Sequence, residues 1–529
     1  MSIASYRTAP SSTEQGWPKG VPYIVGNEGC ERFSYYGMSA ILYTYIVAMH
    51  GSGDFATSVV HLFISGVYAF PMIGAVIADR LLGKYHTILW FSLVYCLGHF
   101  VLSMTEGSMA GMYVGLGLIA LGAGGIKPCV SAHVGDQFGK SNWYLITKVY
   151  QLFYFMINFG SFFATLLIPL TQKYFGWSVA FAVPGILMFV ATVVFWMGRN
   201  KFVHIPAKPG GFLGFLDALS STFLFMTIGS LAFTARFSTP FAISISVACF
   251  MIGLVLFQVR QNHSPDDGFL AVSVAATSDW FKRMMMRIAN IGVVFSMATS
   301  SGNPQPRRAV VRASAIRQQF SEESIEGTLA VLRIVSIFLF VSIFWALFDQ
   351  HGSSWIRQAQ MMNLKLGGVE LLASQIQGLN PLLIMLLIPV MSKLFGHIKP
   401  LVRMSVGMGI ASVSFVVVAV IQAQLDGGNQ LHVGWQLLPY TLITIAEVLV
   451  SITGLEFAYT QAPKRMKSTV MGFWLLSVAF GNILVAFTAR FAALPLVSFF
   501  WVFAGLMALA ALLFSMRAYF YVPRDYPQT

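Results

Sequence analysis

The sequence is poor in charged residues and lacks the motifs of common membrane enzymes and pumps. Charged residues make up 10% of its 529 residues, against about 25% in a typical soluble protein. Neither of the hydrolase patterns H-E-x-x-H and G-x-S-x-G occurs. The segment Gly135 to Ser141 falls one residue short of a phosphate-binding loop, and no nucleotide-binding domain accompanies it. These absences argue against an enzyme and against an ATP-driven pump.

Cysteine is scarce, and a secretory signal is missing. The four cysteines (Cys30, Cys96, Cys129 and Cys249) stand singly in apolar runs, without the spacing of a disulfide framework or a metal site. The first 20 residues are polar and hold no short apolar core before a cleavage site, so we expect no signal peptide. We expect the cysteines to fill space, and we expect no metal or other cofactor.

The sequence instead contains fourteen apolar stretches. Each is near the length needed to cross about 30 Å of hydrocarbon, which predicts an all-α polytopic membrane protein with fourteen transmembrane helices. The stretches cover residues 21–49, 57–79, 86–105, 109–133, 149–171, 177–197, 212–234, 238–259, 328–350, 371–392, 401–423, 433–460, 469–489 and 495–516.

The positions of the basic residues predict which ends of the stretches face the cytoplasm. If the N-terminus lies inside, 25 of the 33 Lys and Arg residues fall on cytoplasmic segments and five on outer ones. Long loops follow the positive-inside rule poorly, but leaving out the eight on the 260–326 linker still gives seventeen against five. Both termini are therefore predicted to be cytoplasmic, and the net charge of +13 requires no nucleic-acid partner. Three basic residues lie within stretches or at their edges: Arg32, Lys127 and Arg333.

The stretches divide along the chain into groups of six, two and six. This predicts a six-helix bundle in 1–200, two extra helices with a cytoplasmic linker in 201–326, and a second six-helix bundle in 327–529. Within the linker, 281–297 is apolar enough to lie on the membrane surface. Gly74 to Lys84, which contains Asp79-Arg80, resembles the loop signature of the major facilitator superfamily, and Ser392 to Lys399 is a weaker copy. The resemblance implies two parallel bundles with substrate bound between them.

Charged residues interrupt the first stretch. Glu28, Arg32, Tyr36 and Ser39 share one face of a helix, since they follow at i, i+4, i+8 and i+11. A charge within the bilayer costs about 2.5–3.5 kcal/mol on insertion scales, so such residues ordinarily face a wet cavity and help to move ions or substrate. A structural ion pair that fixes helix packing is the alternative.

Two further charges lie deep in other stretches. Lys127 follows about eighteen apolar or small residues, and its ammonium needs an anion, either the Glu28/Glu31 pair or a substrate carboxylate. Glu447 lies about fifteen residues into its stretch, near the midplane. The N-terminal ammonium of a peptide would suit a carboxylate in that position.

Four motifs in chain order resemble those of the proton-dependent oligopeptide transporter family of the major facilitator superfamily. They are ExxERFxYYG at Glu28 to Gly37, GGIKP at Gly124 to Pro128, the Phe153 to Ser161 segment, and Glu447 with Gly454 to Pro463. The two extra stretches and the short connection near Asp426 resemble bacterial members. The resemblance implies a proton-coupled symporter that imports di- and tripeptides by alternating access across a bacterial inner membrane. A same-fold transporter of another small anionic or peptide-like solute is the alternative.

The resemblance also implies roles for individual residues. The proton-coupling set would be Glu28, Glu31, Arg32, Lys127, His61 and Asp349. The loop with Asp79 and Arg80 would respond to conformation. Substrate would be bound by Arg32, Tyr36, Tyr68, Lys127, Asn158, Trp345, Asn380, Glu447 and Trp474. The expected partners are peptides, protons and lipid, with no nucleic acid, a monomeric functional unit, and the proton gradient as energy source in place of a cofactor.

The chain departs from the family pattern at Ser39 and Ile452. The family usually carries an arginine at the position of Ser39, and this arginine pairs with an acid that Asp349 supplies here. We therefore expect His61, near the outer end of its stretch, to pair with Asp349 when protonated. Ile452 replaces a proline.

Overall fold

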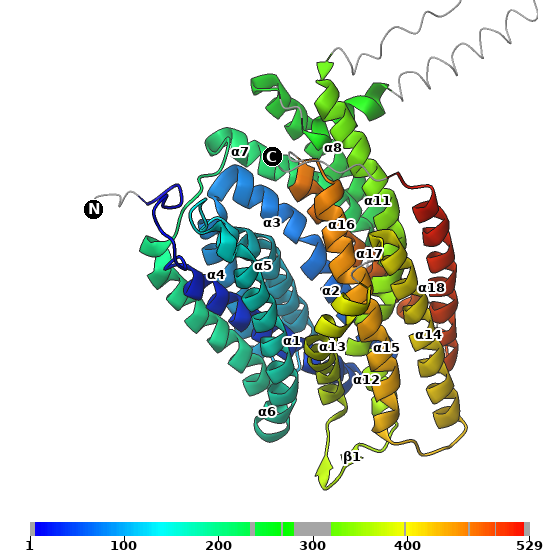
Figure 1. The fold of residues 1–529 in the computed structure, drawn as a ribbon. Coiled ribbons are helices and arrows are strands. Elements are labelled where there is room, and N and C mark those ends of the chain that lie inside the picture. The colour runs from blue at the N-terminus through cyan, green and yellow to red at the C-terminus, as the bar shows by residue number, and fades with distance from the viewer. Residues whose placement is uncertain are drawn as a thin grey trace, which may run out of the picture.

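The computed structural model describes residues 6–232, 239–265, 268–279, 319–395, 398–463, 466–491 and 494–522. Figure 1 shows long helices side by side, with both termini towards one end and a small β-hairpin at the opposite end. The first half contains α1 (Val21–His50), α2 (Gly53–Ala69), α3 (Pro71–Ile77), η1 (Ala78–Leu82), α4 (Lys84–Met104), α5 (Met109–Gly135), η2 (Trp143–Leu145), α6 (Ile146–Met197) and η3 (Gly198–Lys201).

Two helices, α7 (Gly211–Ala232) and α8 (Thr239–His263), follow the first half. The second half contains α11 (Glu322–Phe348), η5 (Asp349–Gly352), α12 (Ser354–Ala359), β1 (Lys365–Leu366), β2 (Val369–Glu370), η6 (Ala373–Gly378), α13 (Leu379–Phe395), α14 (Pro400–Asp426), η7 (Val433–Gln436), α15 (Leu437–Glu447), η8 (Val448–Ile452), α16 (Thr453–Gln461), α17 (Lys467–Phe491) and α18 (Leu496–Tyr519).

All fourteen predicted stretches coincide with helices. Among the described residues, eleven helices are long and apolar enough to cross a membrane. One of them, Trp143–Lys201, contains two spans, because the backbone turns at Gly176 with a φ of 84°. α1, which carries three charges, and α7, with an apolar part at Gly211–Thr227, complete the set. The all-α polytopic fold is confirmed, whereas segment 281–297 lies outside the described residues.

Close packing between helices depends on small residues. A Cβ on Gly74 of α3 would lie 2.1 Å from the carbonyl oxygen of Gly124 in α5, so only glycine allows these backbones to approach so closely. The contact lies one turn before Lys127 on the same helix. The glycine-rich segment therefore fixes the position of a buried charge as well as the packing.

Polar contacts join the two halves, residues 6–201 and 319–522, near one end of the molecule. We call the end with the β-hairpin the hairpin end and the opposite one the termini end (Figure 1). Near the hairpin end, Arg357 pairs with Asp54 at 2.6 Å, and Gln375 donates to the Leu166 carbonyl at 3.0 Å. The structure is therefore closed at the hairpin end.

Candidate functional site

Four buried charges from α1 and α5 form one cluster, which we call the charge cluster: Glu28, Glu31, Arg32 and Lys127. Arg32 Nε lies 2.6 Å from Glu28 Oε1 and 3.3 Å from Glu31 Oε2. Lys127 Nζ lies 3.8 Å from Glu31 Oε1. Glu31 thus stands between two cations, and the cluster holds two acids and two bases. Its charges balance without a ligand.

Aromatic rings enclose the lysine of the charge cluster. Lys127 Nζ lies 4.4 Å from the centre of the Tyr35 ring and 5.4 Å from that of Tyr68. Such cation–π contacts stabilise an ammonium that has lost its water. Glu31 and Lys127 have no regular hydrogen bond partner for their buried polar atoms, despite the ion pair. The Lys127–Glu31 contact is therefore a loose one that the lysine can leave.

The second half holds a carboxylate without a cation. Glu447, at the end of α15, accepts a hydrogen bond from Asn380 Nδ2 of α13 at 2.8 Å. Asn380 Nδ2 also lies 3.2 Å from Thr444 Oγ1. Glu447 is partly exposed, and no lysine or arginine among the described residues pairs with it. This carboxylate has room for an external cation.

Two tryptophans predicted to bind substrate contact each other in the second half. The Trp345 ring of α11 and the Trp474 ring of α17 lie 6.1 Å apart at 82°. Trp474 packs directly over Gly454, where a Cβ would lie 2.1 Å from the ring. Trp345 Nε1 is buried without a hydrogen bond partner among the described residues. The pair forms an apolar wall with one unused N–H donor.

The remaining predicted pocket residues lie between these groups or beside them. Tyr36 lies one turn after Arg32 on α1, with its ring centre 5.1 Å from that of Tyr35. Tyr68 contributes its ring to Lys127. Asn158 is buried, and its Nδ2 donates to the Tyr154 carbonyl at 3.0 Å. One of the N–H donors of Asn158 is therefore already used by a carbonyl of its own helix.

The predicted ion pair between His61 and Asp349 is wrong for this structure, because Asn482 of α17 lies between them. His61 Nδ1 is 2.6 Å from Asn482 Oδ1, and Asn482 Nδ2 donates to Asp349 Oδ2 at 2.6 Å. Asn482 Nδ2 is therefore a donor, its Oδ1 is an acceptor, and His61 Nδ1 carries a proton. His61 Nε2 lies 2.8 Å from the Ser353 hydroxyl. We call these four residues the gate network.

The gate network replaces an ion pair with an amide bridge for a clear reason. A carboxamide has both a donor and an acceptor, so it joins a carboxylate to an imidazole N–H without a second charge. Ser39, the residue in place of the family arginine, leaves its Oγ without a hydrogen bond among the described residues. His61 and Asn482 are fully buried. The network links α2 to α17 and to η5 with the adjoining Ser353, near the hairpin end.

The loop with Asp79 and Arg80 contacts the two extra helices. Arg80 Nη1 lies 3.7 Å from Asp217 Oδ2 of α7, and Arg260 of α8 lies 2.8 Å from Asp217 Oδ1. The backbone N–H of Lys208 donates to the Asp79 carbonyl at 2.9 Å. The extra helices are therefore fastened to the loop whose role in conformational change was predicted.

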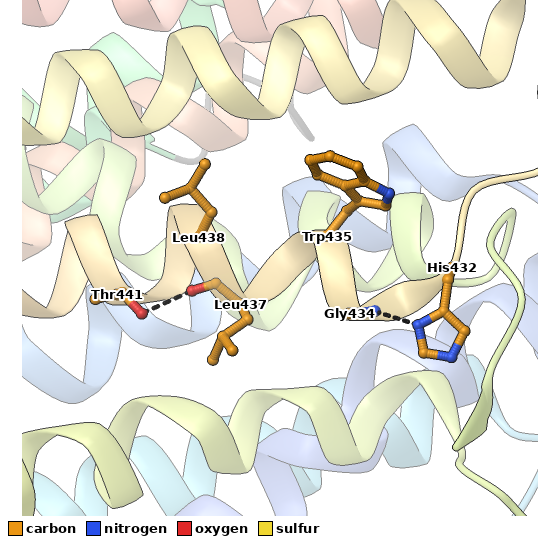
Figure 2. A pocket seen from close by; sticks show the side chains of 6 residues that line it. All are labelled: His432, Gly434, Trp435, Leu437, Leu438 and Thr441. Carbon is orange, nitrogen blue, oxygen red and sulfur yellow. Dashed lines mark hydrogen bonds between the residues drawn. The ribbon is translucent and has the colours of Figure 1, made fainter. Parts of the chain in front are cut away.

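A groove at the start of α15 lies apart from these charges. It has a volume of about 490 Å³ and is lined by His432, Gly434, Trp435, Leu437, Leu438 and Thr441 (Figure 2). His432 Nδ1 accepts from the Gly434 N–H at 2.9 Å, and its Nε2 faces the Lys365 carbonyl at 2.7 Å. Thr441 donates to the Leu437 carbonyl at 2.8 Å. The polar groups of His432 and Thr441 are already paired and the lining holds no charged side chain, so the groove is a poor site for a charged solute.

Sequence reasoning missed Asn482, Ser353 and Asp217. Asn482 is the amide in the apolar stretch 469–489, and Asp217 is the acid in the stretch 212–234. The cost of burying polar groups in a bilayer, which singled out Glu28, also applies to these two. Ser353 lies in a short connection where a serine carries no such signal.

A profile of the POT family, PTR2, matches residues 85–214 and 214–502. The chain belongs to the POT family. Solute carrier family 15 member 2 from Rattus norvegicus is 26% identical over 98% of this chain and 92% of that protein. This membership confirms the predicted class of a proton-coupled peptide transporter and rules out the enzyme alternative.

Solved structures agree with this assignment. The crystal structure of an auto inhibited POT family peptide transporter is 35% identical, covers 97% of this chain and 99% of its own, and superposes with a TM-score of 0.76. A crystal structure of a proton dependent oligopeptide (POT) family transporter is 40% identical over 93% of this chain and 100% of its own, with a TM-score of 0.68. The major facilitator architecture predicted from the sequence is confirmed.

Proposed function

We propose that this transporter imports di- and tripeptides together with protons by alternating access, with the charge cluster coupling protons and Glu447 binding the peptide amine. The observation that carries the proposal is the contrast in charge between the halves. Glu31 lies between Arg32 and Lys127, whereas Glu447 has only the Asn380 amide. The terminal charges of a short peptide lie about 5–10 Å apart and fit a site with cations on one side and a carboxylate on the other.

Proton coupling follows from competition inside the charge cluster. While Glu31 is ionised, it holds Lys127 at 3.8 Å and Arg32 at 3.3 Å. Protonation of Glu31 or Glu28 removes one negative charge, which frees a cation for the carboxylate of the peptide. The loose Lys127–Glu31 contact suits this exchange, because it separates at little cost. One proton entering the cluster thus prepares one cation for substrate.

Amine binding follows from the lone carboxylate. A peptide ammonium at Glu447 forms a charge-assisted hydrogen bond, about twice as strong as a neutral one. The Asn380 amide orients Glu447 through its 2.8 Å bond. Trp345 and Trp474 supply an apolar wall that tolerates different side chains. The site would thus recognise termini and backbone rather than one sequence.

The closed hairpin end supports an inward-facing state if the termini lie in the cytoplasm, as the basic residues predict. In that orientation Asp54, Arg357 and the gate network close the outer side. We place the protein in a bacterial inner membrane and propose that one chain is the functional unit. The division into bundles at 1–200 and 327–529, with 201–326 between them, belongs to the same proposal.

Liposomes test the proposed function. Purified protein is reconstituted, and uptake of a panel of labelled di- and tripeptides is measured with and without an inward proton gradient. The proposal requires concentrative uptake of several peptides with the gradient, and no concentrative uptake when a protonophore dissipates it. Uptake of a small anion in preference to every peptide would contradict it.

A further inference from the structure

Two arginines line a groove on the protein surface between α11 and α18, away from the charge cluster and the gate network. Arg333 and Arg517 line one groove with a volume of about 290 Å³, together with Phe520, Tyr521 and Val522. Neither arginine belongs to the proposed transport site. Arg333 is one of only three basic residues that lie within or at the edge of the apolar stretches of the sequence.

The two arginines have no acidic partner. Among the described residues, neither of them forms an ion pair. Arg517 Nη2 donates to Ser336 Oγ of α11 at 3.1 Å, and its guanidinium lies 5.6 Å from the Tyr521 ring. The Arg333 side chain makes no hydrogen bond to the described part of the chain. Since each guanidinium carries five N–H donors, most of the donors in the groove are available to a ligand.

The groove lies at the level of a membrane surface. Arg517 is in the last turn of α18, a helix of 24 residues. At 1.5 Å per residue it lies about 31 Å from the first residue of α18, close to the thickness of the hydrocarbon core. Figure 1 shows α11 continuing past the end of α18 on the termini side. Both arginines are thus placed where lipid headgroups begin.

Helix dipoles explain only part of this arrangement. A cation in the last turn of a helix is stabilised by the helix dipole, which accounts for Arg517. Arg333 is eleven residues past the start of α11, far from either helix end. Its neighbours on that helix face lipid: Leu329, Leu332 and Leu339 are 48%, 50% and 59% exposed. On α18, Leu512 and Met516 are exposed in the same way.

We propose that Arg333 and Arg517 bind the phosphate of an anionic phospholipid headgroup in the leaflet at the termini end. Guanidinium groups bind phosphate through paired N–H donors. Basic pockets between transmembrane helices recognise anionic headgroups. Exposed Leu339 of α11 and Leu512 of α18 lie on the bilayer-centre side of Arg333 and Arg517, where they would meet the acyl chains. The occupant is therefore a lipid rather than a soluble phosphate, which would leave this apolar surface uncovered.

Native mass spectrometry of the full-length protein in detergent tests the proposal. Phosphatidylglycerol, phosphatidylcholine and diacylglycerol are titrated against wild type, Arg333→Gln, Arg517→Gln and the double variant. Each single change should weaken phosphatidylglycerol binding at least about fivefold, the effect of one basic residue near an anionic surface. Diacylglycerol, which lacks the phosphate, should bind no better to wild type than to the double variant.

Two controls make the result specific. Arg490→Gln removes an exposed arginine near the C-terminal end of α17, at the hairpin end and far from the groove. It should leave phosphatidylglycerol binding unchanged. The Arg333→Lys/Arg517→Lys variant keeps both charges and should retain most of the binding, which separates charge from folding. Equal phosphatidylglycerol binding by wild type and the double Gln variant would overturn the proposal. So would equal loss in Arg490→Gln, or displacement of the lipid by millimolar inorganic phosphate.

Discussion

The two halves of the transporter hold their buried charges in opposite ways. In the first half, two acids and two bases contact one another within 3.8 Å, so the charge cluster is neutral without a ligand. In the second half, Glu447 has an amide for a partner and no cation among the described residues. A balanced cluster can exchange partners internally when a proton arrives. An unbalanced carboxylate requires a partner from outside.

This difference separates two tasks that a symporter must combine. The half with internal compensation is suited to respond to protons, because protonation of either acid changes which cation is free. The half in which Glu447 lacks a cation is suited to respond to substrate. Coupling then requires only that Arg32 or Lys127 reach the same peptide that Glu447 holds.

The largest effect is expected from the charge cluster. Glu31→Gln removes the acid between Arg32 and Lys127. Lys127 is then freed permanently while Arg32 keeps Glu28, so protons no longer control the lysine. Gradient-driven uptake should be abolished while peptide exchange remains measurable, and Glu28→Gln should behave alike. The measurement is uptake into liposomes with an inward proton gradient, next to counterflow without one.

Glu456→Gln is the matched control. Glu456 is an acid of the second half that pairs with Arg403 at 3.0 Å and is 50% exposed. Its loss should leave gradient-driven uptake intact. Concentrative uptake by both Glu28→Gln and Glu31→Gln would show that the cluster does not couple protons.

The next largest effect is expected at Glu447. Glu447→Gln keeps the hydrogen bond to Asn380 possible but removes the charge that holds an ammonium. Loss of a charge-assisted pair costs about 1.5–3 kcal/mol, or roughly 10- to 150-fold in affinity. Peptides with a free amino terminus should lose this much in competition binding, whereas N-acetylated peptides should change little.

Glu370→Gln, an exposed acid in β2, is the control for this change. It lies on the hairpin and should leave both peptide types unaffected. An equal loss for free and acetylated peptides in Glu447→Gln would remove Glu447 from the amine site.

A smaller effect is expected from the gate network. His61→Ala removes the imidazole through which the first half contacts Asn482 and Ser353 of the second half. The hairpin end should open more readily, by about 1–3 kcal/mol for the polar groups left unpaired. Distances between spin labels at the hairpin end measure this effect.

Ser39→Arg provides the companion test for the gate. An arginine there restores the family residue that pairs with the acid at Asp349, so it should recover closure in the His61→Ala background. Asn429→Ala, whose amide contacts Gln424 on the exposed surface, is the control. Unchanged closure in His61→Ala would contradict a gating role.

The smallest effect concerns the packing that positions Lys127. A Cβ on Gly124 would lie 2.5 Å from the Phe70 side chain, so Gly124→Ala should lower the free energy of unfolding by about 1–3 kcal/mol through overpacking. Gly117 on the same helix has open space around it, and Gly117→Ala should leave stability unchanged or raise it by up to about 1 kcal/mol. Denaturation in detergent measures both, and equal stability would show that α5 is not held by close packing.

The sequence predicted the fold and the charge cluster because both leave signals that do not depend on distant contacts. Apolar length alone located the fourteen helices. The i, i+4 spacing placed Glu28 beside Arg32, and the pair is observed at 2.6 Å. Glu447 and Lys127 stood out because isolated charges in apolar stretches are costly.

The gate network could not be predicted in the same way. His61 and Asn482 lie 421 residues apart in the chain, with Ser353 between them, and only the packing of α2 against α17 brings them together. The family pattern led us to expect His61 near Asp349. The sequence does not show that the Asn482 amide lies between them. The contact between the extra helices and the Asp79–Arg80 loop also depends on tertiary packing. Asp217 meets Arg80 only after α7 packs on the loop.

The most direct test of the division between the halves is one ratio measured for two variants in the same liposome preparation: gradient-driven uptake divided by peptide exchange at saturating peptide. In Glu31→Gln this ratio should fall to the value seen without a gradient. In Glu447→Gln it should stay near that of wild type, with a raised half-saturating concentration for peptides with a free amine. Equal loss of the ratio in both variants would show that proton coupling is not confined to the charge cluster, and would contradict the account.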